Sequence, residues 1–316
     1  MSVSPDAPLP DAPATDVHVK ATLIGATAVL LWSTLALFTV LSGRIPPFQL
    51  LAMSFAVASL IGLIWSIRKR GSLRAACATF RQPLSVWALG VGGLFGYHFA
   101  YFLALRLAPP VEANLLNYLW PLLIVLFSAL LPGHRLRWFH LVGALLGLAG
   151  TALIITGVET ASSDDASSFA GLGVALAAAL IRSSYSVLNR RLPDVPTETV
   201  TGFCLATSLL AIPAHLVFEQ SVMPTAIEWL AALALGLGPV GGAFFVWDYG
   251  TKRGDIRVLG ALAYLAPLLS TLSLVVIGVR GFDWLLGLAC LLIIGGAVMA
   301  SAEMWRKPRK MTEMLN

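Results

Sequence analysis

Ten apolar runs, each of about 20 residues, constrain the fold of this chain more than any other feature. They cover residues 21–40, 48–67, 87–107, 110–131, 139–156, 169–187, 200–217, 229–249, 257–277 and 284–302. A helix of that length crosses the ~30 Å hydrocarbon core of a bilayer. Lipid offers the backbone no hydrogen bonds, so only helices and closed barrels span it, and unbroken apolar runs indicate helices. We therefore predict an all-α integral membrane protein with ten transmembrane helices.

The charged residues support a lipid environment and a defined orientation in it. Only 12% of the chain is charged, whereas soluble domains carry roughly 25%. The net charge of +5 does not predict nucleic-acid binding, because nearly all Lys and Arg residues fall in alternate loops and the C-terminal tail. The opposite loops hold only Arg44, Arg106 and Arg280. The positive-inside bias therefore predicts that both termini are cytoplasmic, with basic loops that can contact anionic lipid.

The second half of the chain repeats a pattern of the first half at a constant offset of 146 residues. The matching pairs are Gly92 and Gly238, Gly96 and Gly242, Phe99 and Phe245, Leu116 and Leu262, Tyr118 and Tyr264, Leu119 and Leu265, Pro121 and Pro267, Leu122 and Leu268, Leu123 and Leu269, and Leu126 and Leu272. Such an offset indicates an internal duplication. In a membrane protein, duplication is typical of transporters whose site lies between the halves.

Each repeat holds five predicted helices, so the second half must enter the membrane from the opposite face. The repeats are therefore expected to be inverted. We place the first repeat at residues 20–158, an external linker at 159–168 and the second repeat at 169–303. A disordered cytoplasmic tail, residues 1–19, precedes them, and a basic cytoplasmic tail, residues 304–316, follows.

Polar and aromatic side chains gather in the interior of six of the ten predicted helices. Interfacial Trp and Tyr belong at helix ends, whereas most of these lie at mid-span, where no lipid headgroup reaches them. The candidate substrate-binding residues are Trp32, Ser33, Tyr97, His98, Tyr101, Asn117, Trp120, Ser183, Tyr185, Trp247 and Tyr264. The serines have the alternative of bonding to their own helix. The pattern predicts an uncharged, ring-lined chamber whose aromatic faces hold a substrate ammonium by about 0.5–2 kcal/mol.

Three ionisable residues within the spans need partners or a function. Arg182 and Asp248 both lie toward the cytoplasmic ends of their helices. An unpaired charge at the bilayer centre costs at least ~2.5–3.5 kcal/mol, so we expect an Arg182–Asp248 ion pair, with snorkelling of each side chain as the alternative. His98 is a candidate proton carrier because its unperturbed pKa lies near neutrality. A neutral histidine bonded to a tyrosine or to substrate is the alternative.

Backbone breaks and small residues suggest where helices bend and pack. Pro121 and Pro267 occupy matching mid-span positions, and proline removes a helical hydrogen bond. We predict hinges there, with simple packing as the alternative.

Glycines mark close helix contacts in the fifth and tenth predicted helices; they are Gly143, Gly147, Gly150, Gly287, Gly295 and Gly296. We expect these faces to pack within a monomer, with homodimerisation as the alternative.

The sequence favours a carrier over an enzyme or a channel. It contains no phosphate-binding loop, no Gly-x-Ser-x-Gly motif and no His-Glu-x-x-His motif, and its spans hold no clustered carboxylates, histidines or cysteines. We therefore expect no catalytic activity, no cofactor and no metal site. A channel needs a continuous polar lining, whereas this chain has one polar band. The expected partners are a small-molecule substrate and membrane lipid.

The repeat and its motifs resemble the drug/metabolite transporter superfamily in its EamA-type branch. The resemblance covers roughly residues 20–303 and is carried by Trp32-Ser33, the Gly96/Gly242 pair, and Tyr118-x-x-Pro121 with its copy Tyr264-x-x-Pro267. Within that branch the chain is most similar to the bacterial aromatic amino acid exporters (YddG-like).

The resemblance implies a carrier in the bacterial inner membrane that works by alternating access and exports aromatic or other hydrophobic amino acids. Export of another small amphipathic metabolite or drug, and channel-like facilitation, are the alternatives. One motif departs from the branch. Many EamA-type proteins have a Gly-Glu pair after helices four and nine, where this chain has Gly133-His134-Arg135 and Arg280-Gly281-Phe282. No role of those glutamates therefore applies here.

Overall fold

The computed structural model describes residues 14–132, 136–156, 169–276 and 283–301, and every regular element in those residues is a helix. The first half contains α1 (Ala14–Ser33), α2 (Leu35–Leu41), α3 (Pro47–Arg70), α4 (Leu73–Ala78), α5 (Leu84–Val91), η1 (Gly92–Gly96), α6 (Tyr97–Leu107), α7 (Pro110–Asn117), α8 (Trp120–Ser128) and α9 (Trp138–Thr156). The second half contains α10 (Phe169–Asn189), η2 (Thr197–Thr199), α11 (Val200–Phe218), α12 (Ala226–Leu237), η3 (Gly238–Gly242), α13 (Ala243–Arg253), α14 (Ile256–Leu262), α15 (Leu265–Val276) and α16 (Trp284–Ala300).

The apolar character of these helices agrees with the all-α membrane prediction. Among the described residues, eight helical stretches are long and apolar enough to cross a membrane, and Glu112–Ser128 and Trp284–Ala300 are shorter apolar helices. The N-terminal boundary is corrected, because α1 already begins at Ala14, inside the predicted tail. The predicted linker and the basic C-terminal tail lie outside the described residues, and so do the two segments that depart from the family pattern, Gly133-His134-Arg135 and Arg280-Gly281-Phe282.

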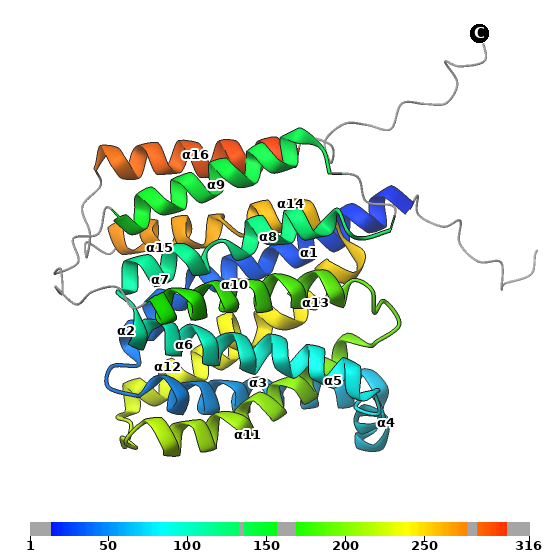
Figure 1. The fold of residues 1–316 in the computed structure, drawn as a ribbon. Coiled ribbons are helices and arrows are strands. Elements are labelled where there is room, and N and C mark those ends of the chain that lie inside the picture. The colour runs from blue at the N-terminus through cyan, green and yellow to red at the C-terminus, as the bar shows by residue number, and fades with distance from the viewer. Residues whose placement is uncertain (1–13, 133–135, 157–168, 277–282, 302–316) are drawn as a thin grey trace, which may run out of the picture.

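The helices run side by side along one direction, and the two halves enter the bundle from opposite ends (Figure 1). α1 begins and α16 ends at the right of the view, whereas α10 begins at the left. Helices of the first half pack on helices of the second half: α9 on α16, α3 on α11, α1 on α13, and α6 on α10. The centre of the bundle is therefore built by helices from both halves.

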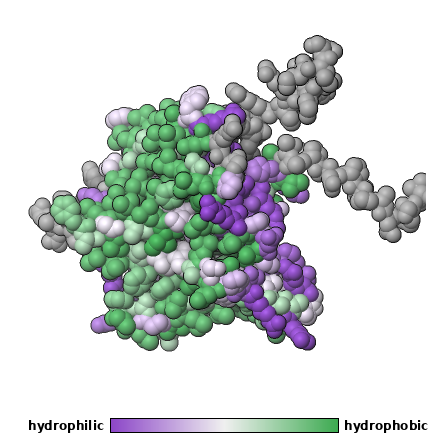
Figure 2. Space-filling view, turned by 45° about the vertical axis from the view of Figure 1, so that its right-hand side comes forward, coloured by the Kyte–Doolittle hydropathy of each residue, from purple (hydrophilic) through white to green (hydrophobic). Residues whose placement is uncertain are grey.

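The outer surface has a broad hydrophobic belt and a hydrophilic region at one end (Figure 2). Basic residues close α3, where Arg68, Lys69 and Arg70 occupy the last turn, and Lys252 and Arg253 close α13. A helix end with several cations suits an aqueous boundary lined by anionic lipid headgroups.

The repeat appears in the backbone as two matching irregularities. π-helical turns interrupt the third helix of each half at Gly92–Gly96 and Gly238–Gly242, at the offset seen in the sequence. The fourth helix of each half also breaks, between α7 and α8 and between α14 and α15. Pro121 and Pro267 lie in the first turn of the segment that follows each break, where the missing proline N–H leaves no gap in the helical bonding.

The glycines of α9 allow close packing within the chain. A Cβ on Gly143 would lie 2.6 Å from the carbonyl oxygen of Gly296 in α16, and one on Gly150 would lie 2.6 Å from Ile293 Cγ1. Gly147 faces the ring of Tyr264. Gly295, in contrast, faces open space. Most of the small face on α9 is therefore used to hold α9 against α16 and α15.

Candidate functional site

The centre of the bundle holds one arginine surrounded by aromatic rings, which we call the ring cluster. Arg182 lies two-thirds of the way along α10, and its side chain is packed among rings from α1, α6, α8 and α13. The distances from its Cζ atom to the ring centroids are 4.8 Å for Trp32, 4.8 Å for Phe244, 5.2 Å for Trp120, 5.5 Å for Tyr97 and 6.0 Å for Trp247. Both halves of the chain therefore contribute to one site.

The three tryptophans of the ring cluster also pack on one another. The Trp32 centroid lies 4.9 Å from that of Trp247 and 5.8 Å from that of Trp120, the latter pair edge to face. Trp247 is fully buried, and its Nε1–H donates to Ser186 Oγ at 3.1 Å. Such aromatic pairs contribute about 0.5–1.5 kcal/mol each beyond their buried area. Trp32 is only half-buried, so it forms the accessible side of the trio.

Arg182 has no anionic partner in the part of the chain that the structure describes. The residue is 3% exposed, it makes neither a salt bridge nor a side-chain hydrogen bond, and its Nη1 is buried with no protein acceptor in reach. Cation–π attraction to the surrounding rings, about 0.5–2 kcal/mol for each ring, compensates part of the lost hydration. The guanidinium therefore retains unused donors at the middle of the bundle.

The predicted Arg182–Asp248 ion pair is wrong, because Asp248 is bonded to other residues. Its Oδ1 lies 2.8 Å from Lys252 Nζ, one turn along α13, and both side chains are buried. Asn189 Nδ2 donates to the same oxygen at 2.9 Å, and Thr197 Oγ1 donates to Oδ2 at 2.7 Å. The carboxylate thus has its full set of donors, and the buried pair ties the end of α10 and η2 to α13.

A second layer, made of aromatic residues from α6 and asparagines from α7, adjoins the ring cluster. The Tyr97 and Tyr101 rings stack in parallel with centroids 6.1 Å apart. Tyr101 OH donates to Asn114 Oδ1 at 2.5 Å, and Asn117 Nδ2 donates to Tyr97 OH at 3.4 Å. Tyr97 and Tyr101 are four residues apart on α6, and Asn114 and Asn117 are three apart on α7. Both spacings are about one helical turn, so each pair shares one face of its helix.

His98 also faces this layer. Its Nδ1 lies 2.7 Å from the Leu94 carbonyl oxygen, which makes Nδ1 the protonated nitrogen. The ring is half-buried and meets Tyr97 and Phe55 edge to face at 4.9 and 5.4 Å. No described residue bonds to Nε2, so that nitrogen is free to exchange a proton or to contact a ligand.

Of four other predicted site residues, three bond to backbone and one, Tyr185, packs in a different part of the bundle. Ser33 Oγ donates to Leu30 O, and Ser183 Oγ donates to Leu180 O, so both serines bond to their own helices. Tyr185 is buried against Gly93 in a separate apolar core with Phe203. Tyr264, the fourth, is fully buried and lies between α8 and α9.

Tyr264 repairs the break between α7 and α8. The Leu122 N–H donates to Tyr264 OH at 3.2 Å, and that hydroxyl donates to the Tyr118 carbonyl at 3.2 Å. An unbroken α-helix would join Leu122 N directly to Tyr118 O. The hydroxyl is therefore inserted into the helical hydrogen-bond ladder, which is a known cause of a kink. The hydroxyl thus donates to one backbone group and accepts from another.

Two residues of the site, Phe244 in the ring cluster and Asn114 in the polar layer, were not predicted from the sequence. Phe244 carries no polar atom to distinguish it from the other apolar residues of its run, although it lies one turn before Trp247 on the same face. Asn114 stands one turn before Asn117, and an amide within an apolar run was a detectable signal.

A cavity opens elsewhere, between α1, α3 and α13. Its volume is about 1010 Å³, and its lining includes Ile24, Gly62, Trp65 and Phe245. Lys69, Arg70, Asp194 and Glu198 line its hydrophilic end. None of the residues predicted for the substrate site lines this cavity, so it is separate from the ring cluster.

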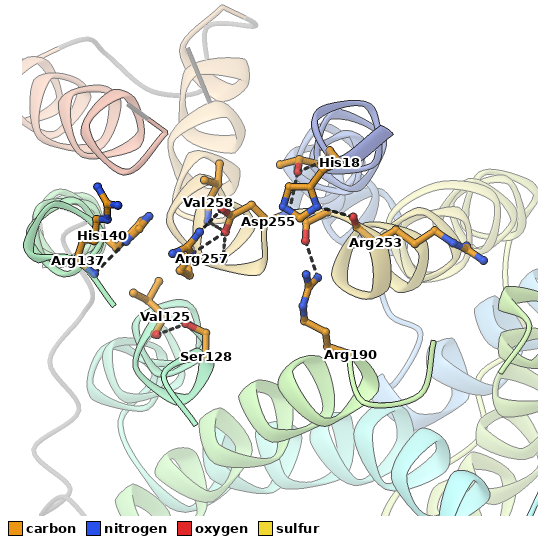
Figure 3. A network of polar contacts seen from close by, with 12 residues as sticks. His18, Val125, Ser128, Arg137, His140, Arg190, Arg253, Asp255, Arg257 and Val258 are labelled. Atoms are coloured by element: carbon orange, nitrogen blue, oxygen red, sulfur yellow. Dashed lines mark hydrogen bonds and ion pairs between the residues drawn. The ribbon is translucent and has the colours of Figure 1, made fainter. Parts of the chain in front are cut away.

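Polar contacts join helix ends at the hydrophilic end of the bundle (Figure 3). His18 Nδ1 of α1 lies 2.8 Å from the Arg253 carbonyl oxygen, and Arg190 Nη1 donates to the Gly254 carbonyl at 2.5 Å. The start of α1 is thus held on the last residue of α13, and the end of α10 on the residue that follows α13.

Asp255 caps α14 in the same network. Its carboxylate accepts from the Val258 N–H and from the Arg257 guanidinium, with Arg257 Nη2 at 2.6 Å from Oδ2. Burial by itself would raise the pKa of this carboxyl, but the bonds with Arg257 and with the helix N-terminus outweigh burial and lower the pKa to about 2. Asp255 therefore stays ionised throughout the physiological pH range.

Known proteins are similar to this chain in sequence, and one solved structure is also similar in fold. The chain is 54% identical over 283 residues to the aromatic amino acid exporter YddG of Ancylobacter novellus, which covers 89% of this chain and 97% of that protein. It is 26% identical to the aromatic amino acid exporter YddG of Escherichia coli K12, over 89% of this chain and 96% of that one. A solved crystal structure with 52% sequence identity superposes with a TM-score of 0.84 over 92% of this chain and the whole of the other.

The two halves match a single family. The sequence profile of the EamA-like transporter family matches residues 19–156 and again residues 169–302. These two matches cover most of the chain, and the helices in each carry the same π-helical turn. The chain belongs to the EamA-like transporter family.

Proposed function

We propose that this protein exports aromatic amino acids through the ring cluster, by alternating exposure of that site to the two sides of the membrane. The observation that carries the proposal is the ring cluster itself, where rings from four helices of both halves enclose one point in the bundle. The names of the relatives at 54% and 26% identity support the same substrate class.

A chain of this family with eight long apolar helices is a multi-pass protein of the bacterial inner membrane. In the proposed arrangement, Glu112–Ser128 and Trp284–Ala300 complete ten spans. The cation-rich ends of α3 and α13 mark the cytoplasmic side, and both termini lie there. Residues 20–158 and 169–303 then form two inverted repeats, joined outside by residues 159–168.

The breaks at Pro121 and Pro267 are the proposed hinges. Each proline lies in the first turn of the helical segment after an interruption, where a residue donates no helical hydrogen bond. The two parts of the fourth helix in each half can therefore change their angle without breaking a bond at the proline. The Tyr264 hydroxyl holds the first of these breaks closed at its backbone. Motion of one half is thereby linked to the other.

Counterflow in proteoliposomes tests the function. We expect externally added phenylalanine to drive saturable exchange of preloaded labelled phenylalanine, and we expect Trp32→Ala to reduce kcat/KM at least about tenfold because a ring of the site is lost. Trp229→Ala is the matched control, because Trp229 is 53% exposed on the outside of α12. Unsaturable flux would indicate a channel, and wild-type kinetics in Trp32→Ala would remove the ring cluster from the pathway.

A further inference from the structure

We propose that the Arg182 guanidinium binds the carboxylate of the substrate, so that the site selects aromatic carboxylates and excludes aromatic amines. The inference rests on the proposed function and specifies the group that is recognised. It concerns one buried cation that the fold holds in the ring cluster without an anion.

The first step is that nothing in the described part of the chain neutralises Arg182. Its guanidinium is buried and makes no hydrogen bond or salt bridge, and Nη1 has no protein acceptor. Asp248, the carboxylate expected to pair with it, is occupied by Lys252, Asn189 and Thr197. An ionised group at this depth is costly unless it is paired, and a substrate carboxylate supplies the missing charge.

The second step is that the rings already hold a cation. Trp32, Phe244 and Trp120 lie within about 5 Å of the Arg182 Cζ atom. A substrate ammonium bound to the same faces would stand beside the guanidinium and be repelled by it. The rings therefore do not bind the substrate ammonium, as the sequence suggested, but the Arg182 guanidinium. The substrate group that this site attracts is its carboxylate.

The third step is geometric. Packing against ring faces occupies the flat sides of a guanidinium and leaves its edge, with five N–H donors in one plane, for other partners. A carboxylate matches two of those donors in a bidentate pair, and such charge-assisted bonds are about twice as strong as neutral ones. The benzene or indole ring of the same substrate can then pack on the half-buried Trp32 or on Tyr97.

Three small ligands separate this inference from the proposed function. Phenylalanine, 3-phenylpropanoate and phenethylamine share one skeleton and carry, respectively, both charges, only the carboxylate and only the ammonium. Binding of each to the purified full-length protein is measured by ligand-dependent thermal stabilisation, titrated to an apparent Kd. We expect phenylalanine and 3-phenylpropanoate to bind at least about tenfold more tightly than phenethylamine.

Variants of Arg182 supply the second readout. Arg182→Gln should weaken the binding of 3-phenylpropanoate at least about tenfold, because the carboxylate loses its partner. The affinity for phenethylamine should stay the same or increase. Arg182→Lys, which keeps the charge without the planar fork, should retain part of the preference. Arg74→Gln is the control, because Arg74 is exposed on α4. A purely structural arginine would change the Tm of the ligand-free protein without changing the order of the three ligands.

The outcomes are distinct. Equal affinity of the wild type for 3-phenylpropanoate and phenethylamine overturns the inference while leaving aromatic amino acid export in place, and so does a preference that survives in Arg182→Gln. Failure of all three ligands to bind overturns the inference together with the proposed function. Where Arg182→Gln does not fold, the wild-type series still tests the inference, because equal affinities for 3-phenylpropanoate and phenethylamine overturn it.

Discussion

Tyr264 shows how one hydroxyl can hold two repeats together. It belongs to the second half of the chain, and its hydroxyl replaces the backbone hydrogen bond between Leu122 N and Tyr118 O in the first half. Tyr118 is the residue that corresponds to Tyr264 in the repeat. A buried N–H or carbonyl that loses its partner costs about 1–3 kcal/mol. The hydroxyl therefore stabilises the interface between the halves.

Tyr264→Phe should lower the free energy of unfolding by about 1–3 kcal/mol, because Leu122 N and Tyr118 O both lose their partner. Thermal unfolding of the detergent-purified protein measures the change as a lower apparent Tm. Tyr249→Phe is the matched control, because the Tyr249 hydroxyl makes no hydrogen bond in the described structure. An unchanged Tm in Tyr264→Phe would show that the break does not depend on the hydroxyl.

His98 is the residue whose charge could couple transport to a pH gradient. Its Nδ1 is committed to the Leu94 carbonyl, so only Nε2 can gain or lose a proton. The proton-carrier role predicts that His98→Gln loses the stimulation of phenylalanine flux by a pH gradient but keeps gradient-free counterflow. Flux assays in proteoliposomes with and without the gradient measure both quantities. Stimulation that persists in the variant would assign His98 to neutral hydrogen bonding.

At the scale of elements, the contacts at the hydrophilic end determine how α10 and α13 are held together. Asp248 and Lys252 form a buried pair on α13, and Asn189 and Thr197 bring the end of α10 and η2 to the same carboxylate. Lys252 Nζ also donates to the Val195 carbonyl at 3.0 Å, in the loop between them. This end of the central helices is therefore closed by one connected network.

Lys252→Met should destabilise the protein by about 3–5 kcal/mol, because it leaves the Asp248 carboxylate buried without its cation. The double variant Asp248→Asn, Lys252→Met should recover much of that loss, since no buried charge remains. Thermal unfolding of the wild type, the two single variants and the double variant gives the coupling free energy. Strictly additive effects would mean that the two charges do not depend on each other.

At the scale of the whole molecule, the features that could be predicted are those that depend on position along the helices. The offset between Gly92–Gly96 and Gly238–Gly242 predicted matching structure, and both segments form a π-helical turn. Trp32 and Trp120 lie at mid-span of their apolar runs, which places both in the bundle interior, and their rings meet there. The depth of a residue in the membrane follows from its position within its apolar run.

The errors concern direction around each helix axis. Arg182 and Asp248 lie in neighbouring helices, each toward the same end, but Arg182 points into the ring cluster while Asp248 points toward Lys252 and Asn189. Tyr264 likewise points toward the break between α7 and α8. The direction of a side chain depends on which helices are neighbours and at what angle, and no residue pattern within one run contains that information.

Thiol labelling of the ring cluster's polar layer tests the account most directly. In a variant with Cys77, Cys204 and Cys290 replaced by alanine, Asn114→Cys places one thiol beside Tyr101. We predict that a membrane-impermeant maleimide labels this thiol and that phenylalanine, but not lysine, slows the labelling at least about fivefold because bound ligand covers the layer. Labelling that proceeds at the same rate with and without phenylalanine would contradict a substrate site between the two halves.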